Sequence, residues 1–233
     1  MLRWPKAFRE LRGDAPLAVY IDLKSPYAYL AIDPTRAMAA AAGVRIDWRP
    51  FTLDIPSYLG SAKLNRGGRV SEQKRTPQQW VGVRYSYMDA RRYANLKGKT
   101  VRGTTKIWNS SLGGISMLWA KQQGDDVFDQ FLDEAYFRFW RRELDIEDAS
   151  VLVELLSKSG ADVEGFRSYV DGPGQLEHER MNRDAFDAGV FGVPTYLVGE
   201  EMWFGREHLP RVSWLLAGQP GEAPDVANRS FSR

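Results

Sequence analysis

Residues 18–31 constrain the fold most, because the pattern changes there from strand-like to helical within a few positions. The stretch opens with an apolar β-type run, breaks at Ser25–Pro26 and continues with helical spacing. Serine favours the N-cap position, and proline favours the first helical position, where its missing N–H costs nothing. The sequence therefore predicts a strand at 17–23 and a helix at 26–42. Ser25 then lies at the positive end of that helix, a place suited to a thiolate or carboxylate.

A second constrained stretch lies at residues 189–199, where Val193–Pro194 directly precedes a strand-like run. A proline that enters a strand after two glycines is a candidate for a cis peptide bond. Residues 195–198 and 201–204 flank Gly199–Glu200, so we expect a hairpin there, followed by a last helix at 206–216.

The chain between these stretches predicts a second strand at 44–51, parallel to the first, and then a long helical region. We expect a loop at 54–70 and helices at 76–97, 109–121, 125–140, 147–158, 162–171 and 174–188. The pattern is that of an α/β protein in which a thioredoxin-like domain, residues 17–55 and 189–217, is split by an all-helical insertion, residues 56–188. Residues 1–16 are predicted to be an irregular tail or a short helix that packs Trp4 and Phe8, and residues 218–233 an irregular tail.

The absence of cysteine excludes disulfides, thiolate metal sites and disulfide exchange by the chain itself. Any sulfur chemistry must therefore use the sulfur of a bound molecule. The two histidines, His178 and His208, lack the spacing of metal ligands, so no metal site is expected. No apolar run approaches the ~20 residues that span a bilayer, and no apolar segment follows the basic start, which favours a cytoplasmic location.

The net charge of +2 conceals a basic segment at residues 63–106. Against two acidic residues, Glu72 and Asp89, this segment carries twelve lysines and arginines. The remainder of the chain has 20 basic and 28 acidic residues. A cationic region on a mildly acidic body indicates an anionic partner, although single charges of this kind are often only solvated helix charges.

Three motifs, in this order, resemble those of 2-hydroxychromene-2-carboxylate isomerases and kappa-class glutathione transferases, which belong to the DsbA-like branch of thioredoxin-fold proteins. They are Ser-Pro-Tyr-x-Tyr-Leu-Ala at 25–31, Phe-Gly-Val-Pro-Thr at 191–195 and Trp-Phe-Gly-x-x-x-Leu at 203–209. The resemblance implies a glutathione-dependent isomerase or transferase that acts on a small aromatic, anionic electrophile. It also implies a homodimer.

The resemblance implies positions for glutathione as well. Ser25 would lie beside the sulfur and stabilise the thiolate, since a donor at a helix N-terminus lowers the pKa of a thiol. The main chain of Val193 would pair with the cysteinyl part, and Arg206 and Glu207 would hold the γ-glutamyl end. The full set of residues implied to bind glutathione is Ser25, Pro26, Tyr27, Val193, Pro194, Arg206 and Glu207.

The implied substrate residues are Trp108 and Asn109, which match an aromatic–Asn pair of the isomerases, and Lys74 and Arg75, which fall near a substrate-contacting pair. The family more often has an apolar residue at the place of Lys24. This lysine adds positive charge beside Ser25 if it faces the site, and otherwise points to solvent.

Two other classes of function stay open on the sequence. Ser25 and Asn109 also fit plain helix caps, in which case the chain is a non-catalytic module that binds an extended peptide or an anionic partner. Nucleic-acid binding through the basic segment is a version of this alternative. It is disfavoured because the aromatic residues interleaved with the charges repeat at helical spacing and are expected to pack inward. These residues are Trp80, Tyr85, Tyr87 and Tyr93.

Overall fold

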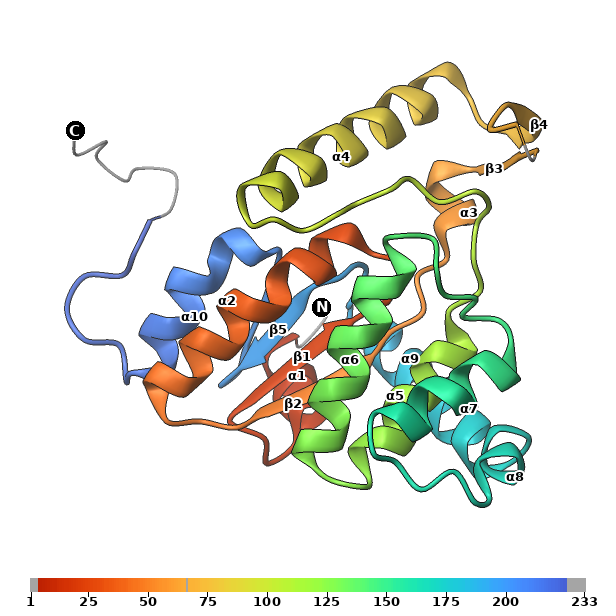
Figure 1. Cartoon of the computed structure of the whole chain (residues 1–233). Coiled ribbons are helices and arrows are strands. Elements are labelled where there is room, and N and C mark those ends of the chain that lie inside the picture. The colour runs from red at the N-terminus through yellow and green to blue at the C-terminus, as the bar shows by residue number, and fades with distance from the viewer. Residues whose placement is uncertain (1–3, 66, 226–233) are drawn as a thin grey trace. The chain divides into compact units, whose positions relative to one another are not determined.

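The protein is described here by a computed structural model that covers residues 4–65 and 67–225. Figure 1 shows its helices and strands in chain order. They are α1 (Trp4–Arg12), β1 (Leu17–Ile21), α2 (Pro26–Ala42), β2 (Ile46–Pro50), α3 (Ile55–Leu59), β3 (Ser61–Leu64), β4 (Val70–Lys74), α4 (Pro77–Leu96), α5 (Ser111–Lys121), α6 (Asp125–Phe139), α7 (Ala149–Lys158), α8 (Phe166–Val170), α9 (Pro173–Asp187), β5 (Thr195–Val198), β6 (Glu201–Phe204), the 3-10 helix η1 (Arg206–His208) and α10 (Leu209–Leu216).

The chain divides into two units, each built from discontinuous segments. Unit 1 consists of Met1–Ile21, Tyr27–Phe51 and Met181–Arg233, and unit 2 of Asp22–Pro26 and Thr52–Arg180. The domain bounds drawn from the sequence, 17–55 with 189–217 and 56–188, stay a prediction. The segment Asp22–Pro26, which directly follows β1, groups with unit 2 rather than with the strand that leads into it.

Unit 1 contains a four-stranded mixed sheet in the order β2-β1-β5-β6. The first strand pairs in parallel with β2 and antiparallel with β5, and β5 pairs antiparallel with β6. Every residue of β1 is buried, as expected for a central strand that is covered on both faces and therefore reads as a continuous apolar run. The predicted α/β thioredoxin-like architecture is confirmed, including the parallel β1–β2 pair and the β5–β6 hairpin.

Of the two alternatives expected for residues 1–16, the structure shows the short helix and not an irregular tail, because residues 4–12 form α1. This helix contacts β5 and β6, and the ring of Phe8 is buried. Arg12 Nε donates to the carbonyl of Gly199 at 3.1 Å, and Arg9 pairs with Glu200 at 3.0 Å. Contacts with a partner far along the chain stabilise a helix that is too short to persist alone. Residues 218–225 form no helix or strand, and residues 226–233 lie outside the described part.

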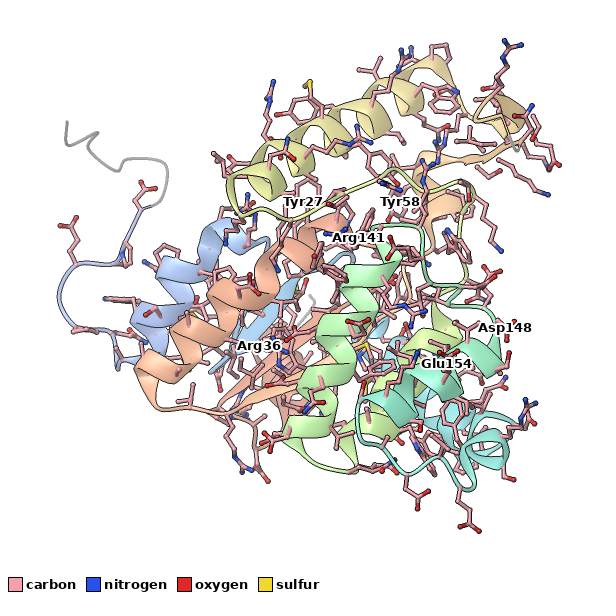
Figure 2. All side chains as sticks on the ribbon, viewed as in Figure 1. Tyr27, Arg36, Tyr58, Arg141, Asp148 and Glu154 are labelled. Atoms are coloured by element: carbon pink, nitrogen blue, oxygen red, sulfur yellow. The ribbon has the colours of Figure 1, made fainter. Side chains whose placement is uncertain are left out.

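Unit 2 has a helical core in which α5 packs against α6, α7 and α8. The close approach at Gly113 needs a glycine, because an added Cβ would lie 2.7 Å from Cδ1 of Leu23. At the exposed start of α7, Asp148 accepts a hydrogen bond from the Ser150 N–H at 2.8 Å. Figure 2 labels Asp148, and also Glu154, which lies farther along α7. Within residues 4–65 and 67–225, no helix has the length and apolar character that crossing a membrane requires.

The insertion is not all-helical, which corrects the prediction from the sequence. Residues 54–70, expected to be a loop, contain α3, β3 and the start of β4, and β3 and β4 form an antiparallel hairpin. Every residue of β4 is exposed, so the strand has no buried face to produce an alternating pattern. Its turn is held by the side-chain oxygen of Asn65, which accepts from the N–H groups of Gly67 and Arg69 at 3.0 Å each.

Candidate active site

The turn between β1 and α2 is organised by Asp22, whose side chain is fully buried. Its two carboxylate oxygens accept main-chain hydrogen bonds, from Leu53 at 2.8 Å and from Lys24 at 3.1 Å. Its carbonyl accepts from the hydroxyl of Tyr136 at 3.0 Å and from the N–H of Ser25 at 3.0 Å. Buried polar groups are stable only when paired in this way, so these bonds hold the turn in one conformation. Ser25, which is 5% exposed, is thereby positioned immediately before α2.

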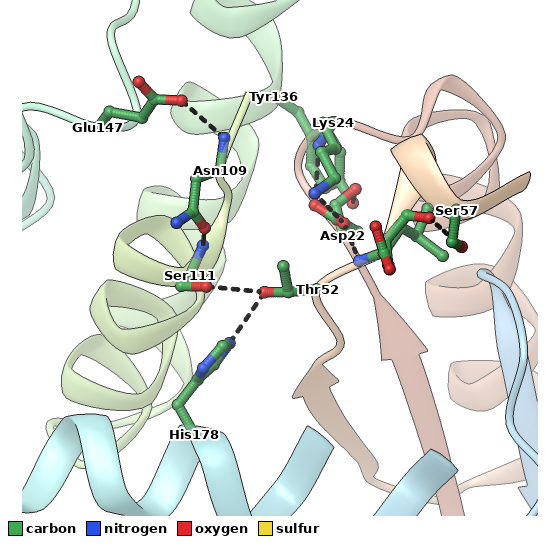
Figure 3. Close-up of polar contacts among 11 residues, drawn as sticks. Asp22, Lys24, Thr52, Ser57, Asn109, Ser111, Tyr136, Glu147 and His178 are labelled. Carbon is green, nitrogen blue, oxygen red and sulfur yellow. Dashed lines mark hydrogen bonds and ion pairs between the residues drawn. The ribbon is translucent and has the colours of Figure 1, made fainter. Parts of the chain in front are cut away.

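Lys24 does not point to solvent, which settles the alternative left open by the sequence. Only 6% of its side chain is exposed, and Nζ lies 3.6 Å from Oδ2 of Asp22 (Figure 3). A buried ammonium needs a counter-charge, and the neighbouring carboxylate supplies it. The structure therefore places a cation within unit 2, next to the turn that carries Ser25.

A second group of polar side chains lies in the same unit and was not singled out by the sequence. Thr52 Oγ1 lies 3.1 Å from Nε2 of His178 and 3.5 Å from Oγ of Ser111 (Figure 3). His178 comes from α9 and is 3% exposed. Burial lowers the pKa of this imidazole to about 4; the positive charge of Lys24 acts in the same direction, while the charge of Asp22 opposes it. The ring is therefore neutral at pH 7 and able both to donate and to accept a hydrogen bond.

The predicted substrate residues Trp108 and Asn109 join this group through the start of α5. Oδ1 of Asn109 accepts from the N–H of Ser111 at 3.0 Å, while its own N–H donates to Glu147 at 2.6 Å. Ser110 occupies the N-cap position of α5, but its side chain makes no capping hydrogen bond. The side chain of Asn109 instead accepts from the first N–H of the helix, in an Asx-type turn.

Lys106 and Glu147 hold this turn from the outside. They form a short ion pair, and Nζ of Lys106 also lies 4.2 Å from the centre of the Trp108 ring. Burial alone would raise the pKa of Glu147, but hydrogen bonds from Lys106 and from the Asn109 N–H, together with the charges of Lys106 and Lys24, lower it. The indole of Trp108 packs edge-on against Phe139 at 5.8 Å. Trp108 is therefore fixed by a cation on its face and by an aromatic ring at its edge.

The structure does not bring Lys74 and Arg75 into this group. Lys74 is exposed at the end of β4, and the guanidinium of Arg75 lies 4.8 Å from the ring centre of Trp80. Among the described residues of unit 2, no contact joins either side chain to Asp22, Thr52 or His178. Both belong to the hairpin and to the start of α4.

Unit 1 carries the other predicted glutathione residues. The Val193–Pro194 peptide bond is cis, and both residues are buried at the entry to β5. The carbonyl of Pro194 accepts from the N–H of Gly205 at 2.9 Å, which holds the start of η1, with Arg206 and Glu207, next to this entry. Gly205 has φ +100°, and a Cβ there would lie 2.4 Å from the Glu207 carboxylate, so the position needs a glycine. Four of the predicted residues are therefore neighbours within unit 1. Tyr27 lies in the first turn of α2, which Pro26 opens.

Among residues 4–65 and 67–225, no three histidine, aspartate or glutamate side chains come together as a set of metal ligands. The sequence signal for the missed group was the rarity of histidine. His178 is one of two in the chain and lies in a helix that is otherwise strongly polar.

Comparison with known proteins adds independent information. Residues 17–217 match the family model of the DSBA-like thioredoxin domain. A 2-hydroxychromene-2-carboxylate isomerase of Pseudomonas sp. (strain C18) is 31% identical over 204 residues, covering 86% of this chain and 90% of the relative. An isomerase of the same name from Sphingobium xenophagum is 27% identical over 191 residues, covering 82% and 92%.

Two solved structures have a similar fold. A 2-hydroxychromene-2-carboxylate isomerase superposes with a TM-score of 0.61 at 22% identity, covering 83% of this chain and 90% of the other. A probable DsbA oxidoreductase from Streptomyces coelicolor superposes with a TM-score of 0.65 at 20% identity, covering 90% and 91%. At these identities the structures bear on the fold alone.

Proposed function

Because this chain belongs to the DsbA-like thioredoxin family and, within it, to the 2-hydroxychromene-2-carboxylate isomerases, we propose that it is an isomerase that uses bound glutathione to convert a small aromatic carboxylate. The observation that carries the proposal is the turn at Asp22–Ser25. In a chain without cysteine, this turn holds a buried serine hydroxyl immediately before a helix, at the place suited to a thiolate.

The residues in unit 1 support glutathione as the source of that thiolate. Glutathione carries an ammonium, which pairs with an anionic side chain, and two carboxylates, which pair with cationic ones. Its extended backbone pairs with main-chain N–H and C=O groups. Arg206 and Glu207 offer the two charges side by side in η1, and the Gly205–Pro194 hydrogen bond ties them to the main chain at Val193. We propose that Glu207 receives the ammonium and that Arg206 pairs with a carboxylate.

When bound, glutathione would supply a sulfur nucleophile beside Ser25 that is regenerated at the end of each turnover, so that none is consumed. The task of Ser25 is to donate its hydroxyl proton in a hydrogen bond to the anionic sulfur, which lowers the pKa of the thiol. Ring opening also requires proton movement at substrate oxygens. His178, neutral at pH 7 and hydrogen-bonded to Thr52, is a group in unit 2 able to orient a substrate oxygen through a hydrogen bond.

The proposal is tested by following the conversion of 2-hydroxychromene-2-carboxylate to its ring-opened isomer by ultraviolet absorbance, with and without millimolar reduced glutathione. We expect conversion to require glutathione and the melting temperature to rise with it, since the ligand binds the folded state. S-methylglutathione is the matched control, because it keeps both carboxylates and the ammonium but lacks the thiol. It should raise the melting temperature without supporting conversion. Equal conversion with and without glutathione would refute the proposal.

A second candidate, a binding module for an anionic partner, is favoured by the surface of α4. Two of the aromatic residues expected to pack inward are exposed instead, Tyr85 at 56% and Tyr93 at 42%. Arg84, Arg91 and Arg92 lie on the same helix. This candidate predicts salt-sensitive binding to a polyanion and no thermal shift with glutathione. The homodimer and the cytoplasmic location stay predictions.

A further inference from the structure

A substrate carboxylate needs a cation in the site, and the two basic residues that the sequence offered for this task, Lys74 and Arg75, lie in the hairpin region. Two other cations lie in the polar group of unit 2. Lys106 is 35% exposed, and its ammonium is held by the ion pair with Glu147 and lies against the face of Trp108. Lys24 is the remaining one, and its environment differs.

We propose that Lys24 binds the carboxylate of the substrate and that Asp22 is the positioning residue that holds its ammonium in place. The proposal rests on the proposed isomerase function and names the group that selects an anionic substrate. It is particular to this chain, since it uses a lysine at the position directly before Ser25.

The hydrogen-bonding capacity of the Lys24 ammonium supports the proposal. A lysine has three N–H donors, and charge-assisted N–H···O bonds are usually about 2.7–2.9 Å long. The distance from Lys24 Nζ to Asp22 Oδ2 is 3.6 Å, which is an ion pair but longer than such a bond. Both carboxylate oxygens of Asp22 already accept main-chain hydrogen bonds, from Leu53 and from Lys24 itself. Asp22 therefore neutralises the lysine without using up its donors.

The burial of the Lys24 and Asp22 side chains also supports the proposal. The Lys24 side chain is 6% exposed, and that of Asp22 is fully buried. Water screens an interaction at this position far less than one at the surface, so an additional anion gains more from the same charge. A buried lysine also costs free energy in the empty protein, and a bound carboxylate would recover part of that cost.

The residues that surround the Lys24 ammonium support the proposal as well. The positive charge of Lys24 acts on His178 and on Glu147, so its ammonium lies among the residues that connect to Trp108 and Asn109. Glu147 is itself satisfied by Lys106 and by the N–H of Asn109 and does not need Lys24. The proposed carboxylate site therefore lies in the same unit as the predicted substrate residues Trp108 and Asn109.

The test measures binding of two non-reactive probes by calorimetry, chroman-2-carboxylate and the neutral chroman-2-carboxamide, to the full chain without glutathione. We expect the wild type to prefer the carboxylate and Lys24→Met to lose that preference through a roughly 10- to 100-fold weaker affinity for the carboxylate alone. Lys24→Arg, which keeps the charge, should retain most of the preference. Lys158→Met is the control, because it removes a lysine from an exposed ion pair with Glu154.

Removing Lys24 leaves Asp22 buried without its partner, so the double variant Lys24→Met/Asp22→Asn is measured alongside, with its melting temperature. It should fold and should bind both probes equally. An unchanged preference in a folded Lys24→Met or double variant overturns the proposal and leaves the pair with a structural role only. Weaker glutathione binding with an unchanged probe preference overturns it too, and assigns Lys24 to the glutathione carboxylates. If the wild type discriminates the probes but needs no glutathione for conversion, the proposed function fails while the carboxylate site stands.

Discussion

Two acid–base pairs of this protein look alike in sequence and differ in structure. One pair is Asp47 and Arg49, which lie on β2 in unit 1. The other pair is Asp22 and Lys24, which follow β1 in the chain and belong to unit 2. In both pairs the two residues are two positions apart. The Asp47 carboxylate lies 2.6 Å from Arg49, whose remaining donors reach the hydroxyl of Tyr20 and two carbonyls at the end of α1. The guanidinium is thus used up, whereas the Lys24 ammonium keeps donors. In the Asp47–Arg49 pair, the N–H donors of the base all have acceptors, and the pair stabilises the fold. In the Asp22–Lys24 pair, the ammonium retains N–H donors with which it can bind a ligand.

The largest effect should come from breaking the saturated pair. Arg49→Met removes hydrogen bonds that join α1, β1 and β2 and removes the ion pair with Asp47. We expect the free energy of unfolding to fall by about 3 kcal/mol, as for a largely buried ion pair, measured by urea denaturation. The discrimination between the two chroman probes should not change. A stable variant with lost discrimination would show that the two pairs have been assigned the wrong way round.

The next effect sharpens the functional side of the comparison. Ser25→Ala removes one hydroxyl and leaves the main-chain hydrogen bond of Ser25 to Asp22 in place. We expect turnover to fall by roughly 100-fold, the usual cost of losing one donor to a developing anion, with glutathione affinity nearly unchanged. Steady-state kinetics at saturating glutathione, compared with calorimetric binding, separates the two quantities. Unchanged turnover would reduce Ser25 to a plain helix cap.

A smaller effect concerns the pH dependence of the free energy of unfolding, through His178 of unit 2. The pKa of His178 is about 4 in the folded protein and 6.5 in an ordinary setting, so the unfolded chain binds more protons between these values. Stability should therefore fall as the pH drops from 6.5, by about 2 kcal/mol at pH 5, and be unaffected above pH 7. His178→Gln should flatten this acid slope in urea denaturation series. The parallel variant His208→Gln measures what the other histidine contributes. A slope that persists in His178→Gln would place its origin elsewhere.

The smallest expected effect lies on the exposed side of unit 1. Glu207→Ala should weaken glutathione binding about tenfold, because one charged hydrogen bond to the ammonium is lost. Glu200→Ala removes an equally accessible carboxylate of the same unit, which pairs with Arg9 outside the predicted set. Calorimetry of both variants is the measurement. Equal losses, or none, would place the γ-glutamyl end away from η1.

Local patterns predicted most of the elements, and they failed where a distant partner decides. The helix at 26–42 and the strands at 195–198 and 201–204 were predicted to the residue, since caps, proline and alternation all mark their ends. The hairpin of β3 and β4 was missed because β4 is held by main-chain pairing and not by an apolar face. The helix α1 was only one of two alternatives on the sequence, because its partners, β5 and β6, lie at the other end of the chain.

The candidate site shows the same limit. The motifs indicated Ser25, Val193–Pro194, Arg206 and Glu207, because each is tied to a local turn or helix start. Thr52 and His178 gave no motif, since they meet from positions more than a hundred residues apart. Nor does any pattern state whether a lysine beside a serine faces solvent.

The amino-acid sequence by itself determined the order of β1, α2, β2, β5 and β6 and the absence of a thiol in the chain, which follow from composition and from short-range rules of capping, turns and periodicity. Its three motifs indicated the family. Only the tertiary structure decided which charges are buried, which donors are saturated and that Arg75 belongs to the hairpin while Lys24 belongs with Asp22. Such properties depend on contacts between distant segments, and burial multiplies the energy of each of them.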